Sequence, residues 1–120
     1  MHIYMMMGVV GLENQELAMN IIVGGGEAKS LAIEAIAYAK EGRFEEAQKA
    51  LMECEKALVE THEVQTDLIK KALSGDKMDV DLLMVHAQDH LMSAITVKDL
   101  AVQMIDLYRE LYKKAGMGGD

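Results

Sequence analysis

Three long stretches of this chain repeat apolar residues in steps of three and four, and no proline interrupts any of them. Such spacing places the apolar side chains on one face of an α-helix. The sequence predicts helices over about 13–41, 44–73 and 79–114. Gly42 and Gly75 mark the two breaks, because glycine commonly follows a helix end. Three such helices with short connections predict an all-α, antiparallel up-down-up three-helix bundle.

A chain of 120 residues is expected to form one domain. We expect this helical domain over 13–115, with a flexible N-terminal tail at 1–12 and a flexible C-terminal tail at 116–120. The first ten residues carry no lysine or arginine and are too few to cross a bilayer, so we expect no signal peptide or membrane anchor. A single cysteine, Cys54, cannot form an intramolecular disulfide, and its position predicts a small core side chain. This cysteine usage suits a cytoplasmic location.

The charge and the apolar content restrict the partners of the chain. A formal net charge of -8 leaves no basic stripe for phosphate backbones and argues against nucleic-acid binding. The third helix is apolar around much of its circumference, which is difficult to bury within three helices alone. We therefore expect a homo-oligomer with the third helix near the shared axis.

Three consecutive glycines, Gly24, Gly25 and Gly26, lie inside the first helical stretch. Each glycine costs a helix interior roughly 1 kcal/mol relative to alanine. We expect a kink or break in the helix here. Close approach of the backbone to a neighbour or a phosphate is the less favoured interpretation.

A polar cluster interrupts the apolar third helix. His86, Asp89 and His90 have i, i+3, i+4 spacing, so they share one side of the helix, and Gln88 lies among them. Polar groups in an apolar setting are costly unless they have partners or chemistry to perform. A second polar patch is formed by residues of the second helix, namely Thr61, His62 and Gln65.

The chemistry that this cluster favours is phosphoryl relay through His86. Neutral imidazole is a good nucleophile near pH 7, and the phosphorus–nitrogen bond that it forms is labile. Gln88, protonated His90, and His62 or Gln65 from the second helix are candidate donors to the phosphoryl oxygens. The carboxylate of Asp89 would repel a phosphoryl dianion, so it should orient a ring, bind a cation or point elsewhere.

Other interpretations remain open at this point. A lone histidine on an apolar face is usually a packed core or interface residue, and local packing is the favoured role of His62 and Gln65. His86, Asp89 and His90 have spacing that permits a metal site, but the His-Glu-x-x-His pattern lacks its glutamate because Ala87 stands there. A metal-dependent hydrolase and a non-enzymatic helical adaptor are the two rival functions.

The segments Val85–Met92, Thr61–Thr66 and Gly26–Ser30 resemble the enzyme IIA component of the lactose/cellobiose group in the bacterial phosphoenolpyruvate-dependent sugar phosphotransferase system. The resemblance spans about Asn14 to Lys114. It implies a cytoplasmic trimeric phosphocarrier. In that family a histidine, here His86, takes a phosphoryl group from the histidine-containing phosphocarrier protein and passes it to a cysteine of the matching IIB protein.

The resemblance also assigns roles beside His86. Asp89 matches a buried aspartate near the threefold axis, where a divalent cation, expected to be magnesium, can sit. Gln88, His90, His62 and Gln65 match neighbouring positions and are expected to support the phosphoryl group. The sugar is expected to be a β-linked disaccharide, with a slight preference for cellobiose or chitobiose over lactose. The run of three glycines is richer than we expect of the family.

Overall fold

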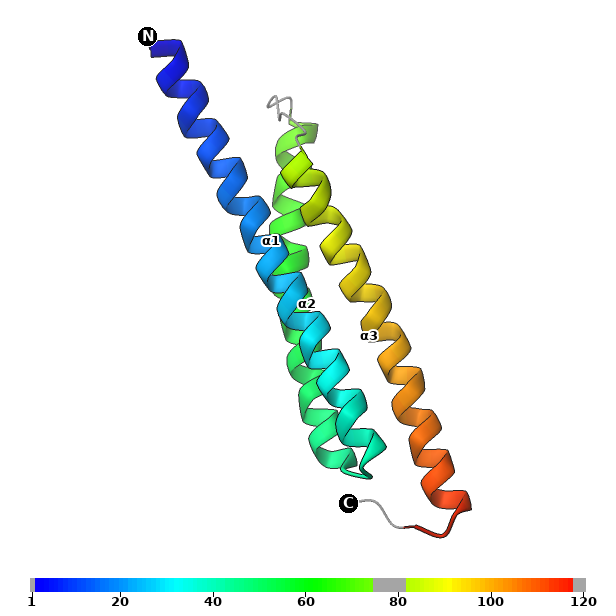
Figure 1. The fold of residues 1–120 in the computed structure, drawn as a ribbon. Coiled ribbons are helices and arrows are strands. Elements are labelled where there is room, and N and C mark those ends of the chain that lie inside the picture. Colours follow the sequence, from blue (N-terminus) through cyan, green and yellow to red (C-terminus); the bar gives the residue numbers. More distant parts are fainter. Residues whose placement is uncertain (1, 75–81, 118–120) are drawn as a thin grey trace.

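The computed structural model describes residues 2–74 and 82–117, with side chains from residue 14 onward except residue 72. In these ranges the chain forms three helices, α1 at His2–Lys40, α2 at Phe44–Leu73 and α3 at Leu82–Lys114, and no strand. Figure 1 shows that successive helices are antiparallel, with α1 and α3 running in one direction and α2 in the other. The all-α three-helix bundle predicted from the apolar spacing is confirmed.

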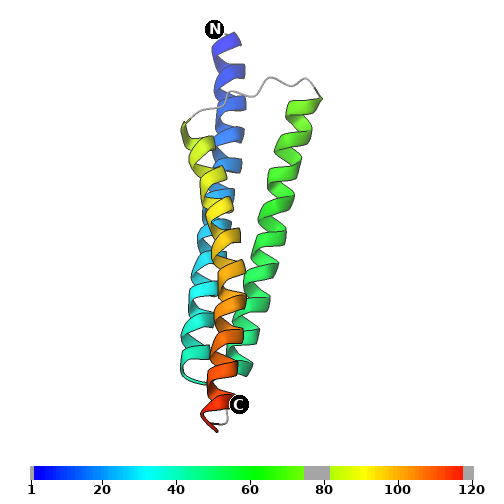
Figure 2. The ribbon, with the colours of Figure 1, turned by 90° about the vertical axis from the view of Figure 1, so that its right-hand side faces the viewer.

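The bundle is long and narrow, measuring 72 × 21 × 19 Å. α1 packs closely against both other helices, whereas α2 and α3 contact each other much less. Figure 2 shows α2 and α3 diverging at one end, with α1 passing behind the space between them. An open groove lined by side chains of α2 and α3 lies between these two helices.

Small residues on α1 explain how it packs so closely against both partners. Four of its alanines, Ala28, Ala32, Ala35 and Ala39, are fully buried and leave room for larger side chains from the other helices. The largest fully buried side chains are Ile21, Leu91, Ile105 and Cys54. Cys54 therefore lies in the core, as predicted.

The course of α1 corrects two expectations. The helix passes through Gly24, Gly25 and Gly26 without interruption, so the expected break is wrong. It also begins at His2, so the backbone at 2–12, expected as a tail, continues the helix. Helix hydrogen bonding extends through this segment because no proline interrupts it. The flexibility that we expect for this N-terminal segment stays a prediction.

The turn between α1 and α2 is built on Gly42, as the sequence predicts. Its φ is 79°, a left-handed conformation that favours glycine. The N–H of Gly42 donates to the carbonyl of Ala39 at 3.0 Å, and the N–H of Arg43 donates to that of Tyr38 at 2.9 Å. These bonds satisfy carbonyls at the end of α1.

The remaining helix boundaries agree with those predicted from the sequence, where the structure describes them. α2 has the predicted bounds. The predicted cap Gly75 and the predicted first turn of α3 lie outside the described residues, as do 118–120 of the C-terminal tail. Gly116, with a φ of 69°, follows the end of α3. No helix in the described part of the chain is both long and apolar enough to span a membrane.

Candidate functional site

One turn of α3 brings the imidazoles of His86 and His90 together. Their Nε2 atoms lie 3.1 Å apart, and the rings are nearly perpendicular, with centroids 4.5 Å apart. His86 is exposed, whereas His90 is half-buried. The exposed ring therefore has one nitrogen held by a neighbour and a face open to an incoming partner.

The surroundings of His90 indicate how protons are arranged in this pair. Its Nδ1 is buried and has no hydrogen-bond partner among the described residues. A buried N–H without an acceptor costs about 1–3 kcal/mol, so the tautomer with the proton on Nε2 is favoured. In that tautomer His90 would donate from Nε2 to Nε2 of His86, because the two atoms lie within hydrogen-bond distance. His86 would then accept at Nε2 and carry its own proton on Nδ1.

Gln88 lies on a different side of α3 from His86, because residues two apart on a helix are about 200° apart around the axis. Its side-chain oxygen accepts a hydrogen bond from the side-chain amide of Gln65 on α2. Both side chains are half-buried. Within one chain the hydrogen bond between these two amides connects α2 to α3. Neither amide is hydrogen-bonded to the His86–His90 pair.

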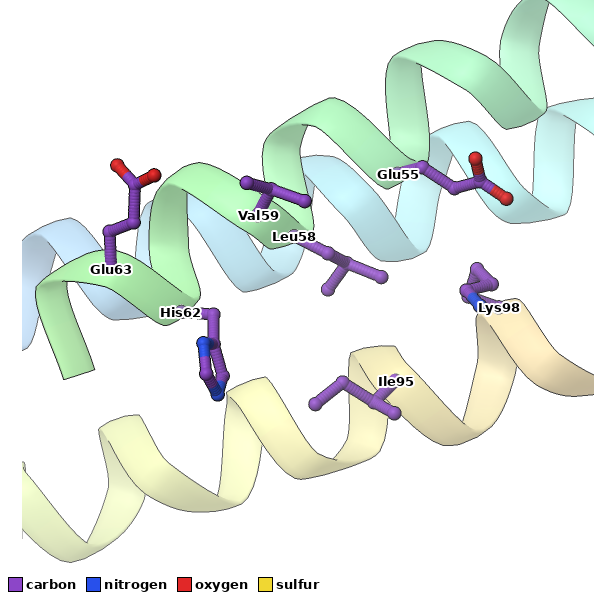
Figure 3. A pocket seen from close by; sticks show the side chains of 7 residues that line it. All are labelled: Glu55, Leu58, Val59, His62, Glu63, Ile95 and Lys98. Atoms are coloured by element: carbon purple, nitrogen blue, oxygen red, sulfur yellow. The ribbon is translucent and has the colours of Figure 1, made fainter. Parts of the chain in front are cut away.

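His62 lies on the same flank of α3 as this amide pair, in an open groove of about 570 Å³ between α2 and α3. Figure 3 shows its ring extending from α2 toward α3, beside the apolar side chains of Leu58 and Ile95. Glu55, Glu63 and Lys98 also line the groove, together with Val59. His62 is exposed and is not part of the hydrogen-bonded His86–His90 pair.

Asp89 is exposed and lies on the side of α3 that faces away from α1 and α2. Helical spacing places it in a stripe of mostly apolar residues, which we call the outward stripe of α3. Its exposed members are Leu82, Val85, Asp89, Met92, Thr96, Leu100, Gln103, Leu107 and Leu111. No group of three or more His, Cys, Asp or Glu side chains within the described ranges converges as a metal site. The side chains of His86, Asp89 and His90 therefore do not converge as a three-ligand group in this structure.

A family model for the lactose/cellobiose-specific IIA subunit of the phosphotransferase system (PTS) matches residues 16–109. The match covers the imidazole pair, the amide pair and most of all three helices. The chain belongs to this IIA family.

Relatives agree with this assignment along most of the chain. The lichenan-specific phosphotransferase enzyme IIA component of Bacillus subtilis is 46% identical over 104 residues, covering 87% of this chain and 94% of the relative. PTS enzyme IIA components are phosphotransferases, and the same holds for this member of the family.

Solved structures show the same fold. The cellobiose-specific enzyme IIA from Bacillus anthracis is 43% identical and has a TM-score of 0.81, covering 82% of this chain and 91% of that one. The IIA(chitobiose) protein of Escherichia coli, solved in complex with HPr, is 40% identical with a TM-score of 0.71, covering 80% and 93%.

Gly24 and Gly25 of α1 approach the helices that carry the site residues of this IIA chain, a role that the sequence analysis gave only as its less favoured interpretation. A Cβ on Gly24 would overlap the Oγ1 of Thr61 on α2. A Cβ on Gly25 would lie 3.2 Å from the carbonyl oxygen of His90 on α3. Close approach to neighbouring helices, the less favoured interpretation, is therefore the correct one for these two glycines. The signal was present as a glycine run, but its partners become visible only in the fold.

Proposed function

We propose that this IIA chain is a phosphohistidine carrier that accepts a phosphoryl group on His86 and passes it on during uptake of a β-linked disaccharide. The donor is the histidine-containing phosphocarrier protein HPr, and the acceptor is a cysteine of the cognate IIB protein. The observation that carries the proposal is the exposed His86 ring, with its Nε2 beside the Nε2 of His90. The complex of a related IIA protein with HPr supports the choice of donor.

In the loading step the Nε2 lone pair of His86 leaves its hydrogen bond with His90 and attacks phosphorus. A new phosphorus–nitrogen bond forms while the bond between phosphorus and the donor histidine breaks, and the donor nitrogen keeps that electron pair. In the unloading step a cysteine thiolate of IIB attacks phosphorus, and the electron pair of the breaking bond returns to Nε2 of His86. No oxidant, reductant or water is consumed in either step.

His90 supports the loaded state by donating a hydrogen bond. With its proton on Nε2, His90 would donate to Nε2 of His86 before transfer, and the transferred phosphoryl group would occupy the space around that nitrogen. The same N–H can then donate to a phosphoryl oxygen. His90 therefore orients the acceptor before transfer and stabilises the added charge afterwards.

We further propose that the carrier is a homotrimer packed through the outward stripe of α3. The side chains of Val85, Leu100 and Leu107 are each more than half exposed in a single chain. Apolar side chains at this helical spacing form a seam suited to a second and a third α3. Association would bury them around a threefold axis.

Threefold packing would also bring Gln88, Gln65 and His62 of one protomer close to the phosphoryl group on His86 of its neighbour. In a symmetric trimer each α3 turns one flank of its stripe toward one neighbour and the other flank toward the second neighbour. His86 and Gln88 lie on opposite flanks of the stripe. The His86 side of one protomer would then face the Gln88 side of the next, so the site would be completed between subunits.

A divalent cation on the axis is part of the same proposal. Three copies of Asp89 in an apolar seam would repel one another unless a cation or protons neutralised them. Carboxylate oxygens suit magnesium, which would be held by Asp89 from each protomer. The ion would have a structural role, because it neutralises charge within the seam.

The test is a reconstituted relay containing phosphoenolpyruvate, enzyme I, HPr, this chain and its IIB partner. Label should reach the IIB cysteine with wild-type protein and should not reach it with His86→Ala. His2→Ala is the matched control, because His2 lies outside the family match at 16–109, and it should transfer label normally. Label on IIB in the presence of His86→Ala would refute His86 as the acceptor.

A further inference from the structure

The hydrogen bond between the side chains of Gln65 and Gln88 has a direction. Gln65, on α2, donates from its amide N–H2 group, and Gln88, on α3, accepts at its side-chain oxygen. Both side chains are half-buried. The bond therefore determines which end of the Gln88 amide faces α2, and it leaves the N–H2 end of Gln88 for another partner.

The N–H2 group of Gln88 can be reached from outside the chain. It has no hydrogen-bond partner among the described residues. In the same part of the chain, Nδ1 of His90 is the one fully buried side-chain nitrogen or oxygen that lacks a partner. The Gln88 nitrogen is therefore not fully buried, and its two N–H donors are open to solvent or to a neighbouring protomer.

The atom that Gln88 presents decides whether it attracts or repels a phosphoryl group. The oxygen and nitrogen of a glutamine amide exchange places by a half-turn of the last side-chain bond. The N–H2 group would donate to a phosphoryl oxygen, whereas the amide oxygen would repel it. Turning Gln88 alone would break its hydrogen bond with Gln65 and bring two N–H2 groups together. Gln65 therefore favours the orientation in which Gln88 is a donor.

Gln65 lies behind Gln88 when the pair is viewed from a neighbouring protomer in the proposed trimer. Gln88 directly precedes Asp89, which belongs to the outward stripe of α3, whereas Gln65 is on α2 and the stripe faces away from α2. A phosphoryl group on the neighbour would meet Gln88 first. Gln65, Gln88 and a phosphoryl oxygen would then form a chain of hydrogen bonds that all run in one direction, and such chains strengthen each member.

We propose that Gln65 is a positioning residue that directs the amide N–H2 group of Gln88 toward the phosphoryl group on His86 of the neighbouring protomer. This inference rests on the proposed function of His86 and on the proposed trimer. Gln65 touches neither the phosphoryl group nor the reacting nitrogen, so it acts through Gln88.

Gln65→Glu tests the direction of the bond, because an ionised carboxylate accepts hydrogen bonds but cannot donate them. The variant can keep the link between α2 and α3, with the Gln88 N–H2 group now donating to the carboxylate and the Gln88 oxygen turned outward. We expect an unchanged urea midpoint, with kcat for loading from HPr about tenfold lower and little change in KM, because a donor to the transferred group is lost. A wild-type kcat would show that Gln65 merely links the helices, and would overturn the proposal.

Gln88→Met provides the control for the charge that Gln65→Glu introduces. Methionine has a similar length and no hydrogen-bonding amide, so Gln88→Met should itself lower kcat about tenfold. Adding Gln65→Glu to Gln88→Met should cause no further loss, because the effect passes through the Gln88 amide. A further tenfold loss in the double variant would show direct repulsion by the carboxylate and would overturn the positioning role.

Mixed trimers test whether the amide pair acts on the neighbouring protomer. His86→Ala protomers cannot be loaded but keep the wild-type amide pair. Assembled together with Gln65→Glu protomers, they should restore fast loading to a fraction of the His86 side chains. Slow loading of every His86 in mixed trimers would overturn the proposal.

NMR of the wild type gives a measurement that does not depend on how any variant folds. Phosphorylation should shift the side-chain N–H2 signals of Gln88 more than those of Gln65. Equal shifts, or none at Gln88, would overturn the positioning role while leaving His86 as the acceptor. A wild-type protein that accepts no phosphoryl group would instead overturn the proposed function.

Discussion

His86 differs from an ordinary surface histidine in that one ring nitrogen already has a fixed neighbour. The 3.1 Å separation of the two Nε2 atoms is within hydrogen-bond range, and the exposed ring leaves room for a partner. The i, i+4 spacing predicted this pairing from sequence, because a single helix determines it. The partners of Gln65, Gln88 and Gly25 depend on how helices cross, which local spacing does not encode.

Cys54 gives a prediction at the residue scale, because burial raises the pKa of its thiol, with a smaller contribution from the nearby Glu55 carboxylate. Below the ordinary thiol pKa, both folded and unfolded chains keep the proton. Above it the unfolded chain ionises first, so stability falls as pH rises, by at most about 1.4 kcal/mol per pH unit from this group. Urea unfolding from pH 7.5 to 9.5 measures the slope.

Cys54→Ala is the control for this prediction. It changes the baseline stability but lacks the thiol, so its stability should fall less steeply over the same pH range. The account of a desolvated thiol fails if wild type and Cys54→Ala keep a constant difference in unfolding free energy across the range.

At the scale of the helices, the apolar spacing predicted that three helices exist, their order along the chain and their alternating directions. It could do so because each helix presents one apolar face to a shared core. α2 has the predicted bounds, with glycine breaks predicted on both sides of it. The wrong prediction was the break at the glycine run of α1. Helix propensity opposes glycine in an interior, but the close contacts that Gly24 and Gly25 permit with α2 and α3 outweigh that preference.

The end of α1 gives a prediction at this scale. Gly42→Ala should destabilise the protein by about 2 kcal/mol, because alanine is strained at a φ of 79° and its Cβ would lie 2.6 Å from Cε1 of Tyr112. Displacing this ring also removes the hydrogen bond from the Tyr112 hydroxyl to the carbonyl of Lys40, which is 3.0 Å long. Chemical denaturation measures the loss.

Gly116→Ala isolates the backbone component of that loss. Gly116 has a similar φ of 69°, but a Cβ there would meet no atom within 4 Å. Its substitution should cost clearly less than that of Gly42. Equal losses at the two positions would show that the packing of Tyr112 contributes nothing.

At the scale of the whole molecule, the structure leaves apolar area uncovered along one side of α3. The excess of apolar residues around the third helix predicted self-association, and the exposed stripe containing Val85, Leu100 and Leu107 supports that prediction. The proposed site between subunits rests on the same stripe, because His86 and Gln88 flank it on opposite sides. Assembly and phosphoryl transfer are therefore coupled in this account.

Leu100→Lys tests the assembly. A lysine in the seam would bring three charges together in an apolar environment, so light scattering should show a trimer for wild type and a monomer for the variant at micromolar concentration. Met52→Lys is the matched control, since Met52 is similarly exposed but lies on α2, and it should remain trimeric. A wild-type monomer, or a trimeric Leu100→Lys, would contradict the proposed interface.

The central claim is that His86 carries the phosphoryl group, and intact-mass analysis tests it most directly. Wild type and His86→Ala are each incubated with phosphoenolpyruvate, enzyme I and HPr, and the mass is read before and after brief acid treatment. The account predicts one acid-labile phosphoryl group per chain on wild type and none on His86→Ala. An unmodified wild type with active upstream proteins would contradict it and favour a helical adaptor.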